Sequence, residues 1–148
     1  MRLATLLALL VLGGCASRVG VAEPPPALVL GTFADDYGST YAITKETWEH
    51  RGYARYHVVR WRPEAGYLVA RNDAANPSDA GRWTRVDWVR LDGMAPYDWA
   101  FCMSAYDAPT AAAAESTRVA RPETPRTGCN GHPFSRMQRT GPADATRP

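Results

Sequence analysis

YARYHVVRW-RPEAG-YLVAR, which spans residues 53–71, has the pattern of two β-strands joined by a turn. Side chains along the first strand are expected to alternate between its two faces, so Tyr56 and Trp61 should lie on opposite faces. Residues 62–66 contain proline and glycine, which favour a turn, and residues 67–71 are again apolar and β-prone. This antiparallel hairpin is the clearest structural signal in the sequence, and it predicts a mainly β fold.

Further hairpins are predicted on both sides of this one. Residues 27–33 and residues 39–44 are β-prone and flank a turn rich in Asp and Gly. Residues 82–91 and residues 97–103 flank an Asp-Gly dipeptide, which is a typical hairpin turn. Residues 45–52 are short and polar, and they predict a turn or a single helical turn. Together these segments predict six strands joined by local turns.

The expected fold is a small antiparallel meander or a barrel of six to eight strands, with a lipocalin-like barrel as one form. We expect the sheet to close or nearly close, because open strand edges promote aggregation. Thr110 can cap one short helix over residues 111–115, whose alanines place it outside the sheet. An irregular C-terminal segment follows, and its arginines predict a solvated tail: Arg118, Arg121, Arg126, Arg136 and Arg139.

Composition limits the chain to one domain and bears on its partners. The five Trp and seven Tyr among 148 residues predict an aromatic core, with a ring-lined pocket as the alternative. The net charge of +2 argues against a nucleic-acid partner, which would require a basic patch or stripe. We expect a single β-rich domain at residues 27–137 and a disordered tail at residues 138–148.

The N-terminus predicts export. Residues 1–14 combine one Arg with a short apolar run, which fits a signal peptide and is too short to span a membrane. Leu12-Gly13-Gly14-Cys15 resembles the bacterial lipobox, which implies that acyl chains such as palmitate are attached to Cys15. The alternative is an ordinary signal peptide cleaved near Ala16.

The resemblance to the lipobox also predicts a location. Residues 15–26 would form the lipidated cysteine and a Pro-rich tether, because consecutive prolines favour an extended chain. The residue after the cysteine is Ala16 rather than an Asp, which by resemblance to Gram-negative lipoproteins favours the outer membrane. The expected location is therefore the bacterial cell envelope, with the protein lipid-anchored and facing the periplasm or the cell surface.

If Cys15 is acylated, Cys102 and Cys129 remain in an oxidising compartment. A disulfide between them is the default prediction, and it would staple the C-terminal segment to the last predicted strand. Two alternatives stay open: Cys129 and His132 as half of a metal site, or Cys129 as a nucleophile beside His132.

Residues 82–91 hold the one candidate for ligand binding. Trp83, Arg85, Asp87 and Trp88 interleave charges with aromatic rings. A salt-bridged strand face would explain this pattern. A small ligand site would arise instead if the sheet closes and the charged side chains point inward beside a Trp.

Known catalytic motifs are absent from the sequence, so we predict no catalytic residue, no metal and no cofactor. The spacing of His50, His57 and His132 matches no zinc motif. A hydrolase or metal-dependent enzyme built from His57, His132 or the loop at Asp73 is the least favoured function.

Several short motifs resemble those of a group of uncharacterised bacterial secreted lipoproteins. They are GTFADDYG at residues 31–38, RNDAANP at 71–77, WTRVDW at 83–88, FC at 101–102, AYDA at 105–108 and GCNGHPF at 128–134. The resemblance spans the folded part of the chain and implies that both cysteines belong to one framework. It implies no activity.

The expected function is that of a membrane-anchored, non-enzymatic envelope lipoprotein that binds a small molecule or a protein partner. The alternative is a purely structural or interaction module whose aromatic residues all lie in the core.

Overall fold

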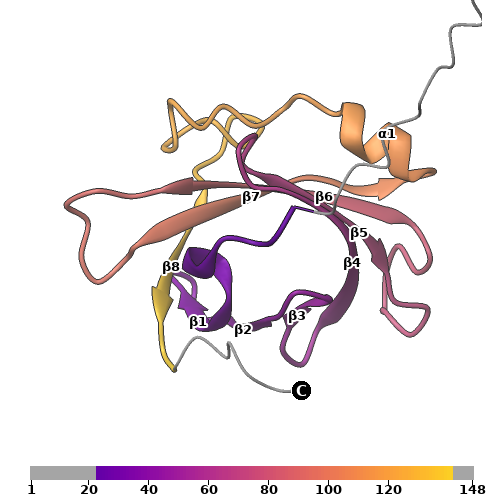
Figure 1. The fold of residues 1–148 in the computed structure, drawn as a ribbon, viewed down its shortest axis with the longest axis horizontal. Helices are drawn as coiled ribbons and strands as arrows, with labels where there is room; N and C mark the ends of the chain where they lie inside the picture. The colour runs from indigo at the N-terminus through magenta and orange to yellow at the C-terminus, as the bar shows by residue number, and fades with distance from the viewer. Residues whose placement is uncertain (1–22, 142–148) are drawn as a thin grey trace, which may run out of the picture.

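Every strand in residues 23–141 pairs with the next one along the sequence, and the last of these strands pairs with the first. The computed structural model describes residues 23–141, and it shows a closed antiparallel barrel of eight strands with one short α-helix (Figure 1). The elements are η1 (Ala27–Val29), β1 (Gly31–Asp35), β2 (Thr40–Ile43), β3 (Thr47–His50), β4 (Ala54–Arg62), β5 (Tyr67–Asn72), β6 (Trp83–Arg90), β7 (Trp99–Ala108), α1 (Ala111–Ser116) and β8 (Ser135–Arg139). The predicted fold class is confirmed.

Two strands lie where the sequence predicted none. Residues 45–52 hold β3, whose Trp48 is fully buried in the barrel, so the prediction of a turn there is wrong. β8 closes the barrel by pairing with both β1 and β7, and it continues to Arg139, past the domain boundary expected at residue 137. Both strands are short and mostly polar, and barrel closure determines their conformation more than their own composition does.

A β-bulge corrects the predicted faces of β4. The register between β4 and β5 shifts between Val58 and Arg60, which inserts one extra residue into β4. The alternation of inward and outward side chains is therefore reset within the strand. As a result Tyr56 and Trp61 are both buried in the same core, rather than lying on opposite faces.

Aromatic and aliphatic side chains fill the barrel interior. Trp48 and Trp99 are fully buried, and their rings meet edge to face with centroids 5.9 Å apart. Trp99 makes a similar contact with Phe33 at 5.1 Å, and Trp48 with Phe101 at 5.2 Å. Edge-to-face packing is a favoured arrangement of aromatic rings. The predicted aromatic core is thus present, and it occupies the space where a lipocalin would hold a ligand.

The N-terminal segment closes one end of the barrel. η1 lies within the ring of strands in Figure 1, and its Val29 is fully buried in the core. At the same end, the backbone N–H of Thr140 donates to the carbonyl of Thr32 at 2.9 Å. The two ends of the described chain therefore meet at one end of the barrel. Arg139 joins them further, because its guanidinium donates to the carbonyls of Leu30 at 2.7 Å and of Leu28 at 3.1 Å.

The outside of the barrel carries a second layer over β5, β6 and β7. α1 packs on these three strands, and the segment at residues 117–134 continues across β7 (Figure 1). The hydroxyl of Thr110 accepts a hydrogen bond from the N–H of Ala113 at 3.1 Å, which confirms the predicted cap. Ala114 is fully buried against the strands because small side chains let the helix approach closely.

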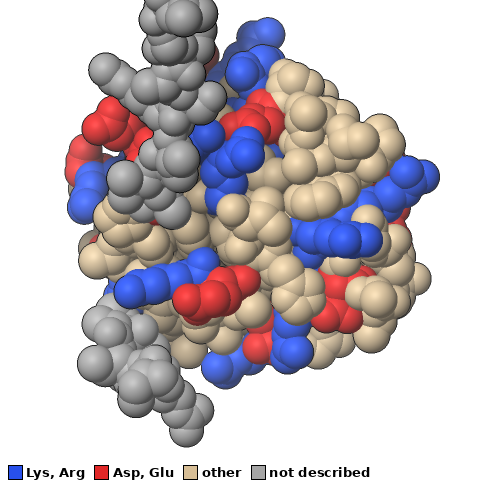
Figure 2. Space-filling model, turned by 45° about the vertical axis from the view of Figure 1, so that its right-hand side comes forward, with Lys and Arg blue, Asp and Glu red and all other residues tan. Residues whose placement is uncertain are grey.

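The predicted signal peptide, Cys15 and most of the tether lie outside the described residues, as does most of the predicted tail. Within residues 23–141, no helix is both long and apolar enough to span a bilayer. Figure 2 shows that acidic and basic side chains are interspersed on the face it presents.

Candidate functional site

A groove with a volume of about 500 Å³ lies on the outside of the barrel, and it is the candidate functional site. Volumes of this size are typical of binding sites in proteins. Its lining comes from the β1–β2 turn, the β6–β7 loop, β7, the segment at 117–134 and β8: Asp36, Tyr37, Leu91, Met94, Ala100, Pro125, Arg126, Pro133, Phe134 and Arg136. Hereafter "the groove" means this set of residues.

The disulfide supports one side of the groove. Cys102 of β7 and Cys129 are bonded, with Cα atoms 5.4 Å apart, which confirms the predicted pair. Cys102 is buried in one apolar cluster with Ala100 and Phe134, which both line the groove. The N–H of Phe134 also donates to the carbonyl of Pro125 at 2.8 Å. The segment that forms this wall has little regular structure, so the disulfide and these few contacts fix its position.

Arg136 and Asp36 form the polar part of the groove. Three hydrogen bonds join them: Arg136 N–H to Asp36 Oδ1 at 3.0 Å, Arg136 Nε to Asp36 Oδ2 at 2.8 Å, and Asp36 N–H to the Arg136 carbonyl at 3.1 Å. The guanidinium also lies over the ring of Tyr97, 4.7 Å from its centroid. The hydrogen bond to Asp36 raises the pKa of Arg136, so this side chain stays charged.

Apolar side chains at the rim of the groove are open to solvent. Tyr37 is 70% exposed and Met94 is 37% exposed. They project from different turns, one after β1 and one between β6 and β7. Arg126 stands exposed on the wall formed by residues 117–134. The groove therefore combines exposed apolar surface with two guanidinium groups and one carboxylate.

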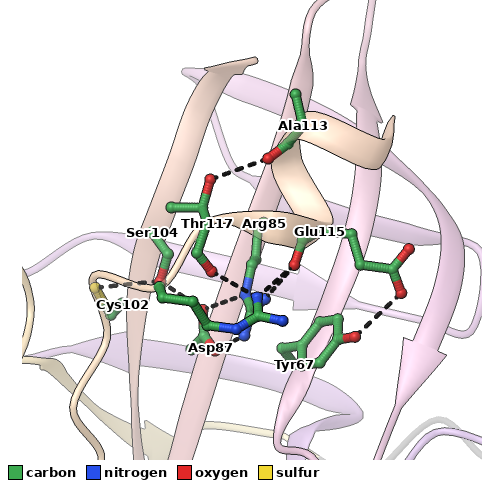
Figure 3. A network of polar contacts seen from close by, with 9 residues as sticks. Tyr67, Arg85, Asp87, Cys102, Ser104, Ala113, Glu115 and Thr117 are labelled. Carbon is green, nitrogen blue, oxygen red and sulfur yellow. Dashed lines mark hydrogen bonds and ion pairs between the residues drawn. The ribbon is translucent and has the colours of Figure 1, made fainter. Parts of the chain in front are cut away.

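A polar network is buried beside α1, on the outer face of β6 and β7 (Figure 3). Arg85 makes a bidentate ion pair with Asp87, through Nε at 2.8 Å and Nη2 at 2.7 Å. Its Nη1 donates to the carbonyl of Glu115 at 2.6 Å, and Ser104 donates to Asp87. The guanidinium also lies over Tyr67, at 3.8 Å from the ring centroid. We call Arg85, Asp87, Ser104, Tyr67 and Glu115 the outer network.

The carboxylate of Glu115 ties α1 to two further strands. It accepts a hydrogen bond from the hydroxyl of Tyr67 at 3.1 Å, and it pairs with Arg60 and with Arg62, the latter at 3.5 Å. Burial alone would raise the pKa of Glu115, but the Tyr67 hydrogen bond and the two arginines outweigh it and lower the pKa. The outer network thus has a partner for each of its charges, and it positions the helix.

The four residues proposed from sequence as a ligand site lie on two faces of β6. Arg85 and Asp87 point outward into the outer network, which confirms the salt-bridged strand face. Trp88 points into the barrel core, where its ring centroid lies 5.8 Å from that of Trp61. Trp83 packs outside beside α1, with Arg71 over its ring. The structure does not bring these four side chains together around one site.

The histidines lie on separate elements. His57 of β4 contacts Asp73, with Nε2 and Oδ2 2.7 Å apart, at the exposed surface. His50 stacks on Tyr41, and burial lowers its pKa. His132 closes a tight turn with Cys129 through two backbone hydrogen bonds of 2.9 Å each. With Cys129 held in the disulfide, it is neither a free thiol nor a metal ligand. Between residues 23 and 141 no cluster of three or more His, Cys, Asp and Glu side chains could hold a metal ion.

Sequence reasoning missed the groove. The sequence places Asp36 in a turn, as the structure does, but predicts a solvated tail for Arg136 and Arg139. That second prediction is wrong, because both arginines have defined partners on the barrel. The two partners of the key ion pair are 100 residues apart. Only knowledge that β8 lies beside β1 would have joined them. Neither Asp36, as a charged residue in a turn, nor Arg136, within the sequence Ser-Arg-Met-Gln-Arg, indicates on its own that it belongs to a site.

Comparison with known protein families, with curated proteins and with solved structures finds no match to this chain.

Proposed function

We propose that the protein is a lipid-anchored component of the bacterial cell envelope that binds a partner, without catalysis, in the groove on the outside of its barrel. The observation that supports binding in the groove is the contrast between the filled interior of the barrel and the open groove on its outside. Trp48, Trp99 and Phe33 occupy the barrel interior, whereas Tyr37 and Met94 expose apolar surface beside the groove. Exposed apolar side chains that gather around a concavity mark sites of interaction.

The envelope location is supported by the N-terminal sequence together with the disulfide. The lipobox-like Leu12-Gly13-Gly14-Cys15 supplies the resemblance on which acylation rests. The Cys102–Cys129 bond is of the kind that persists in oxidising compartments such as the periplasm. The anchor would leave the domain at the barrel end that η1 closes, because residues 23–26 lead into η1.

Mass spectrometry of the N-terminal peptide of the mature protein tests the anchor. We expect an acylated Cys15 as the first residue, and the Cys15→Ser variant should lose its association with membranes. A mature N-terminus located after Cys15 and free of lipid would overturn the anchor.

Site-specific photo-crosslinking in living cells tests the groove. A photoreactive amino acid in place of Met94 should give a discrete adduct, and the Tyr37→Ser change should weaken that adduct. The control places the same photoreactive residue at Val59 on β4, which is 55% exposed but does not line the groove. Equal labelling from both positions, or none from Met94, would favour a purely structural module.

A further inference from the structure

Arg136 is held in one orientation, and its two Nη nitrogens make no hydrogen bond to the described residues. Its Nε edge donates to Asp36, and one face of the guanidinium lies against Tyr97. Its side chain is 42% exposed, whereas the Asp36 side chain is only 12% exposed. All hydrogen bonds that join Arg136 to other described residues use its backbone or Nε. The two Nη groups thus form a fixed fork at the groove.

A fixed guanidinium fork suits a carboxylate. Its planar N–H groups match the two oxygens of a carboxylate, and holding the side chain in advance reduces the entropy lost on binding. The local charge also favours an anion. Asp36 offsets one of the two arginines that line the groove, while Arg126 makes no ion pair within residues 23–141. The groove has a surplus of positive charge.

The apolar rim requires a second feature of the occupant. Tyr37 and Met94 border the same concavity as Arg136, and Phe134 and Leu91 line it further. An isolated anion would leave this apolar surface in water. An extended peptide can place an apolar side chain against the rim and a carboxylate two residues away on the fork, because side chains at positions i and i+2 lie on the same face of an extended chain, about 7 Å apart.

We infer that the groove binds a segment of a partner protein in which an apolar residue lies two positions from an Asp or Glu, with the carboxylate on the Nη groups of Arg136. This inference rests on the proposed function, since it specifies the occupant of the same groove. Charge complementarity with Arg126 and Arg136 selects the acidic residue, and the exposed rim selects the apolar one.

An array of short immobilised peptides, probed with the exported protein, tests this inference. Each peptide holds a central Leu and, two residues later, Asp, Asn or Lys, with the other residues varied. We expect retention on the Asp peptides, weaker retention on the Asn peptides and none on the Lys peptides. The Arg136→Gln variant should lose the preference for Asp over Asn, with about a tenfold drop in affinity, because charge-assisted hydrogen bonds disappear.

Two further variants keep the result interpretable. Arg136→Lys retains the charge and removes the fork, so it should recover only part of the affinity. Arg51→Gln removes an exposed arginine of the β3–β4 turn that does not line the groove, and it should bind like the unaltered protein. Thermal melting of each variant separates a loss of binding from a loss of folding.

The outcomes distinguish the inference from the proposed function. Peptides that compete for the groove equally with Asp, Asn or Lys would overturn the inference and leave the groove as a binding site. Retention that Arg136→Gln leaves unchanged would also overturn it. If no peptide binds while Met94 still gives a discrete crosslink in cells, the occupant is of another class and only the inference fails.

Discussion

The two faces of β6 and β7 are both buried, but by different kinds of contact. On the inner face Val86, Trp88 and Trp99 pack into an apolar core. On the outer face Arg85 and Asp87 are buried almost as deeply, at 6% and 4% exposure. The inner face depends on contacts without strict direction, whereas the outer face depends on hydrogen bonds of fixed geometry. The same two strands therefore contribute to the barrel core on one face and position α1 on the other.

The difference predicts different responses to substitution. Apolar packing loses free energy in proportion to the volume removed. A buried ion pair contributes little net free energy when complete, and costs much when only one partner is removed. The outer network should therefore determine where α1 lies more than it determines whether the barrel folds.

The largest loss is expected from the inner face. Replacing Trp99 with Ala should lower the free energy of unfolding by about 4–5 kcal/mol, because Trp99 is fully buried among aromatic rings and would leave a cavity. Urea unfolding followed by far-UV circular dichroism measures this loss. Tyr53→Ala, at a site that is 56% exposed, is the control and should change stability by less than about 1 kcal/mol. Similar losses for the two variants would refute the assignment of the core.

The next largest loss is expected from the outer network. Asp87→Ala should cost about 3–4 kcal/mol, because it leaves the Arg85 guanidinium buried without its carboxylate. The double variant Arg85→Met, Asp87→Leu removes both charges and should recover much of this loss. Hydrogen exchange of α1 amides should nevertheless remain faster in the double variant, because Nη1 of Arg85 no longer holds the Glu115 carbonyl. A double variant no more stable than the single one would contradict this account.

The disulfide should have a smaller effect that is confined to the outside. Cys129→Ser should lower the free energy of unfolding by about 3 kcal/mol, as the closing of a loop of this length by a disulfide predicts. The near-UV circular dichroism of the core tryptophans should persist, while trypsin should cleave more readily at the exposed Arg118 and Arg126. Reduction of the unaltered protein provides the matched comparison. Loss of the tryptophan signal in the folded variant would mean that the disulfide supports the core as well.

The smallest effect concerns pH. The pKa of Glu115 lies below its ordinary value of 4.5 in the folded protein, so the folded state binds fewer protons there than the unfolded state does. Its contribution is fully present above pH 4.5 and is lost as the pH falls through the folded pKa. Glu115→Gln should therefore be less stable than the unaltered protein at neutral pH, by less than about 1 kcal/mol. The two stabilities should converge in acid, and a constant difference across this range would exclude the assigned role.

The hairpin of β4 and β5 and the cap of α1 followed from local sequence patterns. Alternation, turn residues and a Thr before four alanines are signals carried by neighbouring residues. The disulfide also followed, because two cysteines remain if Cys15 is acylated, as its resemblance to the lipobox implies.

Features that depend on distant residues did not follow. β3 and β8 are short strands whose pairing with neighbours determines them, and the bulge near Val58 changes which side chains face inward without any Gly or Pro to mark it. The pairing of Asp36 with Arg136 depends on closure of the barrel between its first and last strands. Local patterns give the elements of this chain, whereas closure of the ring creates its candidate site.

The way the chain enters the barrel determines how the domain bears mechanical load. A pull on the N-terminal side first meets η1, where Val29 is fully buried and Leu30 nearly so. The force must extract these side chains and break the hydrogen bonds from Arg139 before it reaches β1. Those bonds pass the load to β8, so the first and last strands resist it together. The buried side chains at η1 and the hydrogen bonds from Arg139 therefore oppose tension at the end of the barrel where the proposed tether begins.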